Sequence, residues 1–182
     1  MPAATHATTV LAVVRSGRAA VASDGQVTLG SSAVKHRARK VRRLAGGRVL
    51  VGFAGAAADS LALIERFEKC LKKEGGELRR AAVALAREWR TDRVLRRLEA
   101  MMLATDGSAL FLLSGQGDVI EPDEPVAAVG SGADAARAAA VALLEHTELP
   151  AEEIARRAVE IASRICVYTN DQVTVEVVEG CR

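Results

Sequence analysis

The chain has 182 residues, of which 49% are hydrophobic and 26% are charged, and its formal net charge is +2. This length and balance are those of one ordinary globular domain with a full-size core, and they exclude a disordered chain. Aromatic residues make up only 3%, so the core must be aliphatic and a base-stacking platform is excluded. The charge is too small to demand a nucleic-acid partner.

Other features of the sequence argue against a membrane or secreted protein. No apolar run approaches the roughly eighteen residues of a membrane span. Residues 1–7 contain no Lys or Arg, which is unlike a secretory signal. The three cysteines, Cys70, Cys166 and Cys181, are odd in number and show no CxxC spacing. We therefore expect a cytoplasmic protein without a disulfide framework, a zinc site or a membrane partner.

The first third of the chain is predicted to form strands. Apolar runs are bounded by the turn signals Ser16-Gly17 and Asp24-Gly25. The run before Gly55 is apolar enough for a strand covered on both faces. The strands predicted here are residues 10–14, 19–22, 27–29 and 49–53.

The apolar period then changes from that of strands to that of helices. One helix carries Leu63, Ile64, Phe67 and Leu71 on a single face and ends at Gly75-Gly76. A second carries Leu78, Ala82, Leu85 and Trp89, and its pattern extends toward Leu98.

The same alternation of strands and helices repeats in the second half. Short strands are predicted at residues 101–104, 109–113, 126–129 and 173–178. Helices are predicted at residues 133–144 and from Pro150 onward, the latter with the apolar stripe Ile154, Ala158, Ile161 and Ile165. Two helix pairs covering two stacked sheets fit this order, so we predict an α+β fold, a four-layer αββα sandwich built as one domain.

Conventional catalytic motifs are missing. His6, His36 and His146 are scattered outside any metal-binding frame, and neither GxGxxG nor GxxxxGK[ST] occurs. The pair Thr8-Thr9 stands directly before the first apolar strand, after a short segment that no core needs. Threonine is a good strand residue and needs no further explanation there. The alternative is that residues 1–7 are a propeptide whose removal makes Thr8 the N-terminus.

Several long strings of residues resemble the HslV family, the bacterial proteasome-like peptidases that work with the ATPase HslU. The resemblance runs from Thr8 to about Val178 in one register. The strings that carry it are TTVLAVVRSGRAAVASDGQVTLG, KHRARKVRRL, VGFAGAAADSLALIERFE, WRTDRVLRRLEA, AVGSG and RICVYTN.

The resemblance implies a threonine endopeptidase of the N-terminal nucleophile hydrolase type, with residues 8–182 as its single domain. Thr8 would be the nucleophile, and its freed α-amine, with a pKa near 8, would be the base. Lys40 matches the family's active-site lysine and Asp24 the carboxylate that pairs with it. Ser131 matches the active-site serine and Gly52 the donor of an oxyanion-binding N–H. Without the resemblance, Lys40 is one more member of a solvated basic run.

The family also binds a monovalent cation, Na⁺ or K⁺, through backbone carbonyls, and uses no organic cofactor. The matching positions are Ser163, Cys166 and Thr169, with Cys166 expected to be a buried residue that contributes only its carbonyl. The family usually has glycine at position 163 and commonly at position 23, where this chain has Ser163 and Ser23.

The resemblance further implies a homo-oligomer of two stacked six-membered rings, fed with unfolded proteins by HslU, which alone uses ATP. We hypothesise that Lys35 and Arg42 receive the carboxylate tails of HslU. A non-catalytic ring subunit of the same fold is the alternative, and Thr5 and Thr9 are the other possible new N-termini. A nucleic-acid binder based on the basic run alone lacks aromatic interleaving.

Overall fold

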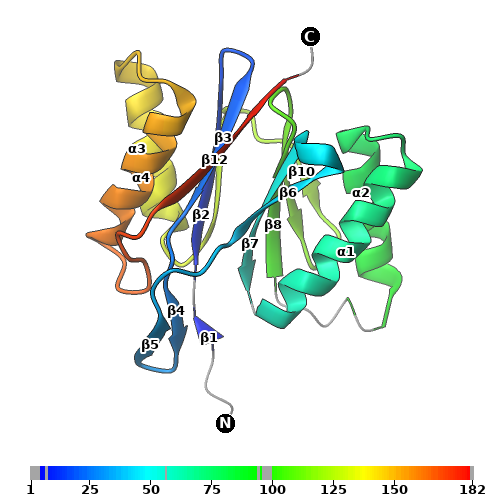
Figure 1. The fold of residues 1–182 in the computed structure, drawn as a ribbon, viewed down its shortest axis with the longest axis horizontal. Helices are drawn as coiled ribbons and strands as arrows, with labels where there is room; N and C mark the ends of the chain where they lie inside the picture. The colour runs from blue at the N-terminus through cyan, green and yellow to red at the C-terminus, as the bar shows by residue number, and fades with distance from the viewer. Residues whose placement is uncertain (1–4, 7, 56, 94, 96–99, 181–182) are drawn as a thin grey trace.

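The computed structural model describes residues 5–6, 8–55, 57–93, 95 and 100–180. Two antiparallel sheets are stacked face to face, and a pair of helices covers the outer face of each (Figure 1). The predicted four-layer αββα sandwich is therefore confirmed. The predicted removal of residues 1–7 remains a prediction, and most of that segment lies outside the described residues.

The first sheet begins with the two strands that flank the Ser16-Gly17 turn. They pair in antiparallel register from Val10↔Ser23 to Arg15↔Arg18. The sheet has the order β11-β2-β3-β12. Its strands are β2 (Thr9–Arg15), β3 (Arg18–Ser23), β11 (Val126–Gly130) and β12 (Thr174–Glu179).

The second sheet has the order β10-β9-β8-β7-β6, and every neighbouring pair in it is antiparallel. Its apolar central strands β7 and β8 are buried between the first sheet and a helix pair, as their continuous apolar runs predict. The strands are β6 (Val41–Leu44), β7 (Val49–Gly55), β8 (Ala100–Thr105), β9 (Leu110–Ser114) and β10 (Val119–Ile120).

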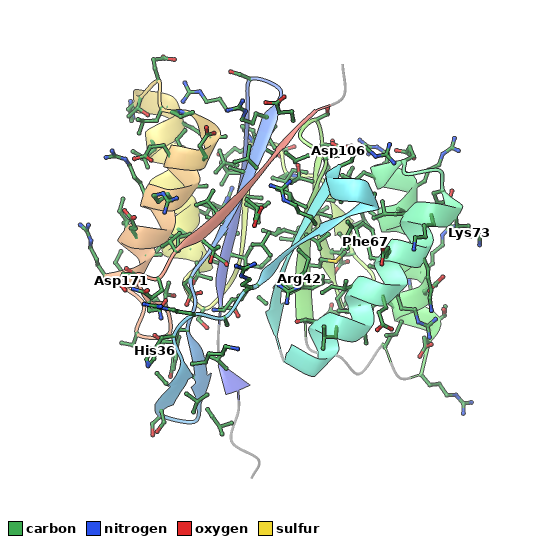
Figure 2. The ribbon with its side chains drawn as sticks, viewed as in Figure 1. His36, Arg42, Phe67, Lys73, Asp106 and Asp171 are labelled. Atoms are coloured by element: carbon green, nitrogen blue, oxygen red, sulfur yellow. The ribbon has the colours of Figure 1, made fainter. Side chains whose placement is uncertain are left out.

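Each helix pair covers one sheet through the apolar face that the sequence predicts. The pair α1 (Ala57–Lys73) and α2 (Leu78–Thr91) packs on the second sheet, and α3 (Ala133–His146) and α4 (Ala151–Ser163) pack on the first (Figure 1). Phe67, labelled in Figure 2, is buried between α1 and the second sheet. A short 3₁₀ helix, η1 (Ala45–Gly47), joins β6 to β7.

A third apolar layer lies between the two sheets, and it contains Val10, Val21 and Leu50. Gly52 of β7 faces this layer, and a Cβ at that position would contact Val10 Cγ1. Glycine therefore lets the two sheets approach closely at this point. This close packing is a structural reason for Gly52 that is independent of any role in catalysis.

The structure adds elements that the sequence did not predict. A small third sheet, in the order β1-β4-β5, contains β1 (Thr5–His6), β4 (Val27–Leu29) and β5 (Ser32–Lys35); β4 was predicted, whereas β1 and β5 were not. β6 and β10 were also not predicted. These strands are short and largely polar or exposed, so their sequence carries little periodic signal.

Two predicted features of the helices are wrong. α2 does not continue toward Leu98, because it ends at Thr91 and Asp92 has an extended backbone (φ −74°, ψ 129°). Residues 96–99 lie outside the described part. Ile165 does not extend the apolar stripe of α4, because the helix ends at Ser163 and Ile165 is 67% exposed.

The packing of α1 can be tested with two leucines of the same helix. Leu63 is fully buried, whereas Leu61 is 59% exposed. We expect Leu63→Ala to lower the free energy of unfolding by about 2–5 kcal/mol, because it removes buried methyl groups and leaves a cavity. Leu61→Ala is the matched control and should change it by less than about 0.5 kcal/mol. Urea unfolding followed by circular dichroism measures both, and equal effects would contradict this packing.

Candidate active site

Thr8 lies immediately before β2, at the end of the first sheet, and is only 3% exposed. Its carbonyl oxygen accepts a hydrogen bond from the backbone N–H of Ser131 (2.9 Å). The backbone of Thr8 has a φ of 132°, which is strained for a β-branched residue. A Cβ at Gly130 would collide with the Thr8 carbonyl oxygen, and Gly130 itself has a φ of 101°. The glycine at position 130 therefore permits this close approach.

Asp24 follows β3 directly, and its fully buried carboxylate is a hub of four donors. Lys40 Nζ and the Thr9 N–H each donate to Oδ1 at 2.7 Å. The backbone N–H groups of Gln26 and Asn170 donate to Oδ2 at 2.8 and 3.3 Å. Donors on both oxygens compensate the loss of water around the charge, so the carboxylate can be buried ionised.

Lys40 precedes β6, and its side chain is 7% exposed. Burial lowers the pKa of its ammonium, and the neighbouring Asp24 carboxylate opposes that shift without cancelling it. The ion pair thus keeps the Lys40 cation largely buried from solvent, beside the N-terminal end of β2.

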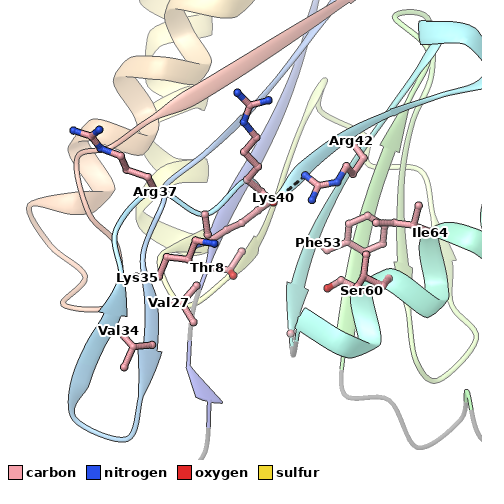
Figure 3. A pocket seen from close by; sticks show the side chains of 14 residues that line it. Thr8, Val27, Val34, Lys35, Arg37, Lys40, Arg42, Phe53, Ser60 and Ile64 are labelled. Atoms are coloured by element: carbon pink, nitrogen blue, oxygen red, sulfur yellow. Dashed lines mark hydrogen bonds between the residues drawn. The ribbon is translucent and has the colours of Figure 1, made fainter.

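Thr8 and Lys40 open onto one cavity of about 770 Å³. Figure 3 shows Thr8 and Lys40 on one side and Phe53 and Ile64 on the other. The apolar side chains of the lining are those of Val27, Val34, Ala38, Phe53, Leu61 and Ile64, and its cations are Lys35, Arg37, Arg39, Lys40 and Arg42. The described lining contains no carboxylate. A cavity of this size and character can hold an extended peptide segment.

The other predicted site residues lie at different distances from this centre. Ser131 contacts Thr8 through its backbone, and its side chain is exposed. Gly52 lies inside β7, between Val41 and Leu103. Among the described lining residues, Gly55 reaches the cavity and Gly52 does not. The catalytic roles of Ser131 and Gly52 therefore remain predictions.

Sequence reasoning did not predict that Asn170 and Thr9 donate hydrogen bonds to the Asp24 carboxylate. The backbone N–H of Asn170 donates to Asp24. The Asn170 side chain accepts a hydrogen bond from the Gly25 N–H through Oδ1 (3.0 Å) and donates one from its amide nitrogen to the His36 carbonyl (3.0 Å). Thr9 joins the same network, with its hydroxyl 2.6 Å from that of Thr169. The partners in this network are up to 160 positions apart, so no local pattern in the sequence indicates that they meet. The one signal was an asparagine after a turn, a residue that often makes hydrogen bonds to the backbone.

Of the predicted cation ligands, Ser163 is the last residue of α4, and Cys166 and Thr169 lie in the segment that follows it. The Thr169 N–H donates to the Cys166 carbonyl (3.1 Å), and the Ser163 hydroxyl donates to the Glu160 carbonyl (2.7 Å). Ser163 does not have a positive φ, so a serine at this position needs no strained backbone. Cys166 is half-buried and not buried as expected, and the role of these three carbonyls as cation ligands remains a prediction. Among the described residues, no cluster of His, Cys, Asp and Glu could hold a metal ion.

Comparison with known proteins gives the family. The family model described as proteasome subunit matches residues 4–178. The protein named ATP-dependent protease subunit HslV from Aquifex aeolicus (strain VF5) is 59% identical over 170 residues, which is 93% of this chain and 97% of that protein. The chain belongs to the HslV family of proteasome subunits. Membership makes it a proteasome-like threonine peptidase of the N-terminal nucleophile hydrolase type.

Other HslV relatives and solved structures agree. The HslV subunit of Sulfurihydrogenibium sp. (strain YO3AOP1) is 57% identical over 172 residues, 94% of this chain and 97% of that protein. The crystal structure of eukaryotic HslV from Trypanosoma brucei matches with a TM-score of 0.89 and 43% identity, over 94% of this chain and 99% of that chain. Thiobacillus denitrificans BPH shares the fold, with a TM-score of 0.72, 22% identity, and 95% and 98% coverage. No helix in the described residues is long and apolar enough to cross a membrane.

The Asp24 hub can be tested by removing its charge alone. We expect Asp24→Asn to lower the free energy of unfolding by about 3–5 kcal/mol, because it leaves the Lys40 ammonium buried without a counter-ion. Glu176→Gln is the control, because it breaks an ion pair with Arg43 that is partly exposed on both sides, for a cost below about 1 kcal/mol. Urea unfolding measures both changes, and equal costs would show that burial does not strengthen the Asp24 pair.

Proposed function

We propose that this chain is the peptidase subunit of a two-component ATP-dependent protease and hydrolyses peptide bonds of unfolded proteins delivered by the HslU ATPase. The observation that carries the proposal is the shared cavity: Thr8 and the buried Lys40 of the Lys40–Asp24 pair open onto the same apolar-walled space. Membership of the HslV family supports the same activity.

Thr8 is the nucleophile in this proposal, and cleavage before it creates the base. A threonine hydroxyl is a weak nucleophile, and a free α-amine with a pKa near 8 can accept its proton directly or through one water. A peptide nitrogen at that position has no useful basicity, so the unprocessed chain is inactive. The strained φ of Thr8 supports cleavage at this bond, because breaking the bond before Thr8 releases the constraint.

Lys40 and Asp24 tune this base. A cation beside the Thr8 amine lowers the amine's pKa and favours its neutral, proton-accepting form near pH 7. The Asp24 carboxylate holds the ammonium in place at 2.7 Å. Ser131 supports the amine in this proposal, and a backbone N–H of β7 receives the charge that develops on the substrate carbonyl oxygen. The resemblance assigns this N–H to Gly52, whereas Gly55 is the glycine of β7 that lines the cavity.

The small third sheet suggests how a peptide reaches Thr8. β1 pairs with β4 in antiparallel register, Thr5↔Leu29 and His6↔Thr28, and so leads the chain to Thr8. Removal of residues 1–7 removes β1 and leaves one edge of β4 open. An extended substrate can then add to that edge by backbone hydrogen bonds, with its side chains in the apolar cavity.

The carbonyls of Ser163, Cys166 and Thr169 hold a monovalent cation, Na⁺ or K⁺, in this proposal. Such an ion supplies a fixed charge that orders the turn after α4. The chain's own contacts transmit that order to the site, because Asn170 donates to Asp24 and the Thr169 hydroxyl contacts that of Thr9.

The assembly we propose is a double ring of two hexamers, which requires heterologous contacts that close on themselves. HslU docks through its tail carboxylates on Lys35 and Arg42, which are exposed and line the same cavity. The Arg42 guanidinium donates to the carbonyls of Arg39 and Val41, and no described carboxylate neutralises it. It is therefore available to an incoming anion.

The nucleophile can be tested by changing Thr8 alone. We expect Thr8→Ala to lower peptide hydrolysis by more than about a thousandfold, because it removes the attacking oxygen, while folding and ring assembly persist. Thr9→Ser keeps its hydroxyl contacts and is the control that should stay active. A fluorogenic peptide assay with an intact-mass measurement reports both activity and the first residue. The proposal is contradicted if Thr8→Ala still hydrolyses the peptide. It is also contradicted if active wild-type particles contain only subunits that keep residues 1–7.

The docking of HslU can be tested by charge reversal. We expect Lys35→Glu to reduce the stimulation of peptide hydrolysis by HslU at least about tenfold, since a like charge then meets the tail carboxylate. Lys72→Glu reverses a charge on the exposed end of α1 and is the control that should keep full stimulation. Titration of HslU against each variant measures the effect, and unchanged stimulation of Lys35→Glu would remove that residue from the docking site.

A further inference from the structure

Ser23 is the last residue of β3 and directly precedes the Asp24 hub. It pairs with Val10 on one side and Thr174 on the other, and it is fully buried. Its hydroxyl has no hydrogen-bond partner in the described part of the chain. A buried hydroxyl left without a partner destabilises a fold, so this one calls for a physical explanation.

The direction of the Ser23 side chain follows from the alternation along β3. Ala20 and Ala22 face the α3–α4 layer, whereas Ala19 and Val21 face the layer between the two sheets. Ser23 has the same parity as Val21 and therefore points toward the second sheet. β3 packs there against β6 and β7, and β6 begins one residue after Lys40.

Lys40 is incompletely satisfied in the same buried region. An ammonium group has three N–H donors. The one hydrogen bond that the structure assigns to Lys40 Nζ within the described residues goes to Asp24 Oδ1. Because the side chain is only 7% exposed, bulk water satisfies the other two donors poorly. Ser23, which directly precedes Asp24, thus has a free acceptor, and Lys40, which pairs with Asp24, has donors without an assigned acceptor.

We propose that Ser23 is a positioning residue, whose hydroxyl accepts a second hydrogen bond from the Lys40 ammonium and holds it between Asp24 and the Thr8 amine. Rotation about χ1 is enough to turn a serine hydroxyl toward a neighbour. This inference rests on the proposed function, since it acts on the lysine that tunes the Thr8 base.

The contact should change the protonation of Lys40 in a direction that can be measured. A hydrogen bond accepted from an ammonium stabilises its charged form, so it opposes the effect of burial on Lys40. Loss of the hydroxyl then lets Lys40 lose its proton at lower pH. The other charged groups that face Lys40 from the two cavities it lines stay constant in the comparison: Lys35, Arg37, Arg39, Arg42, Arg43 and Glu176.

The test compares Ser23→Ala with Ser23→Thr in the processed, assembled enzyme. For Ser23→Ala we expect kcat to fall several-fold with KM unchanged, and the alkaline limb of the kcat profile to move about one pH unit lower. Ser23→Thr keeps the hydroxyl and should keep the wild-type limb. If Ser23→Ala fails to assemble, Ser23→Gly carries the same test, because it also removes the hydroxyl.

A matched control separates this role from the removal of any unpartnered polar group. Trp89 Nε1 is also buried without a partner, but it lies in the layer between α1–α2 and the second sheet. Trp89→Phe should leave both limbs of the pH profile unchanged. The proposal is overturned if Ser23→Ala keeps the wild-type kcat and limbs and only melts at a higher temperature. Failure of the proposed function itself is distinguishable, because intact mass would then show unprocessed subunits in the hydrolysing wild type.

Discussion

The buried charge of Asp24 is the interaction on which the rest of the site depends. A carboxylate with no access to water is stable only if its oxygens are saturated by donors, and here four groups from four separate segments supply them. Each donor that satisfies the charge is also held by it. The start of β2, the turn after β3, Lys40 and the turn after α4 therefore share one fixed point.

That fixed point explains why a threonine peptidase can be built from so few side chains. The Thr9 N–H bonds Asp24, so the residue after the nucleophile is anchored to the same carboxylate as the lysine. Thr8 is held on its other side by the Ser131 N–H, with Gly130 leaving room for its carbonyl. Thr8 and Lys40 are thus placed relative to each other through the one buried carboxylate that both segments contact.

The sandwich supports this arrangement by bringing the ends of two sheets together. Asp24 and Thr8 come from the first sheet, whereas Lys40 and the cavity wall at Phe53 come from the second. Gly52 allows the sheets to approach at that point, because a side chain there would collide with Val10. The close packing between the sheets consequently also determines the geometry of the site. The burial that lowers the pKa of Lys40 is a product of this packing.

The sequence by itself determined the fold class, the main strands and the buried faces of the helices, because their apolar periods of about two and 3.6 residues are local signals. It also indicated the family and the residues Thr8, Asp24 and Lys40 through long matching strings. It did not predict the short strands β1, β5, β6 and β10, the end of α2 at Thr91, or the exposure of Ile165. Only the tertiary structure decided that Asn170 and Thr169 reach Asp24 and Thr9, and that the Ser23 hydroxyl is buried without a partner. Such contacts join positions up to 160 residues apart, and they are set by the stacking of the layers and not by any pattern along the chain.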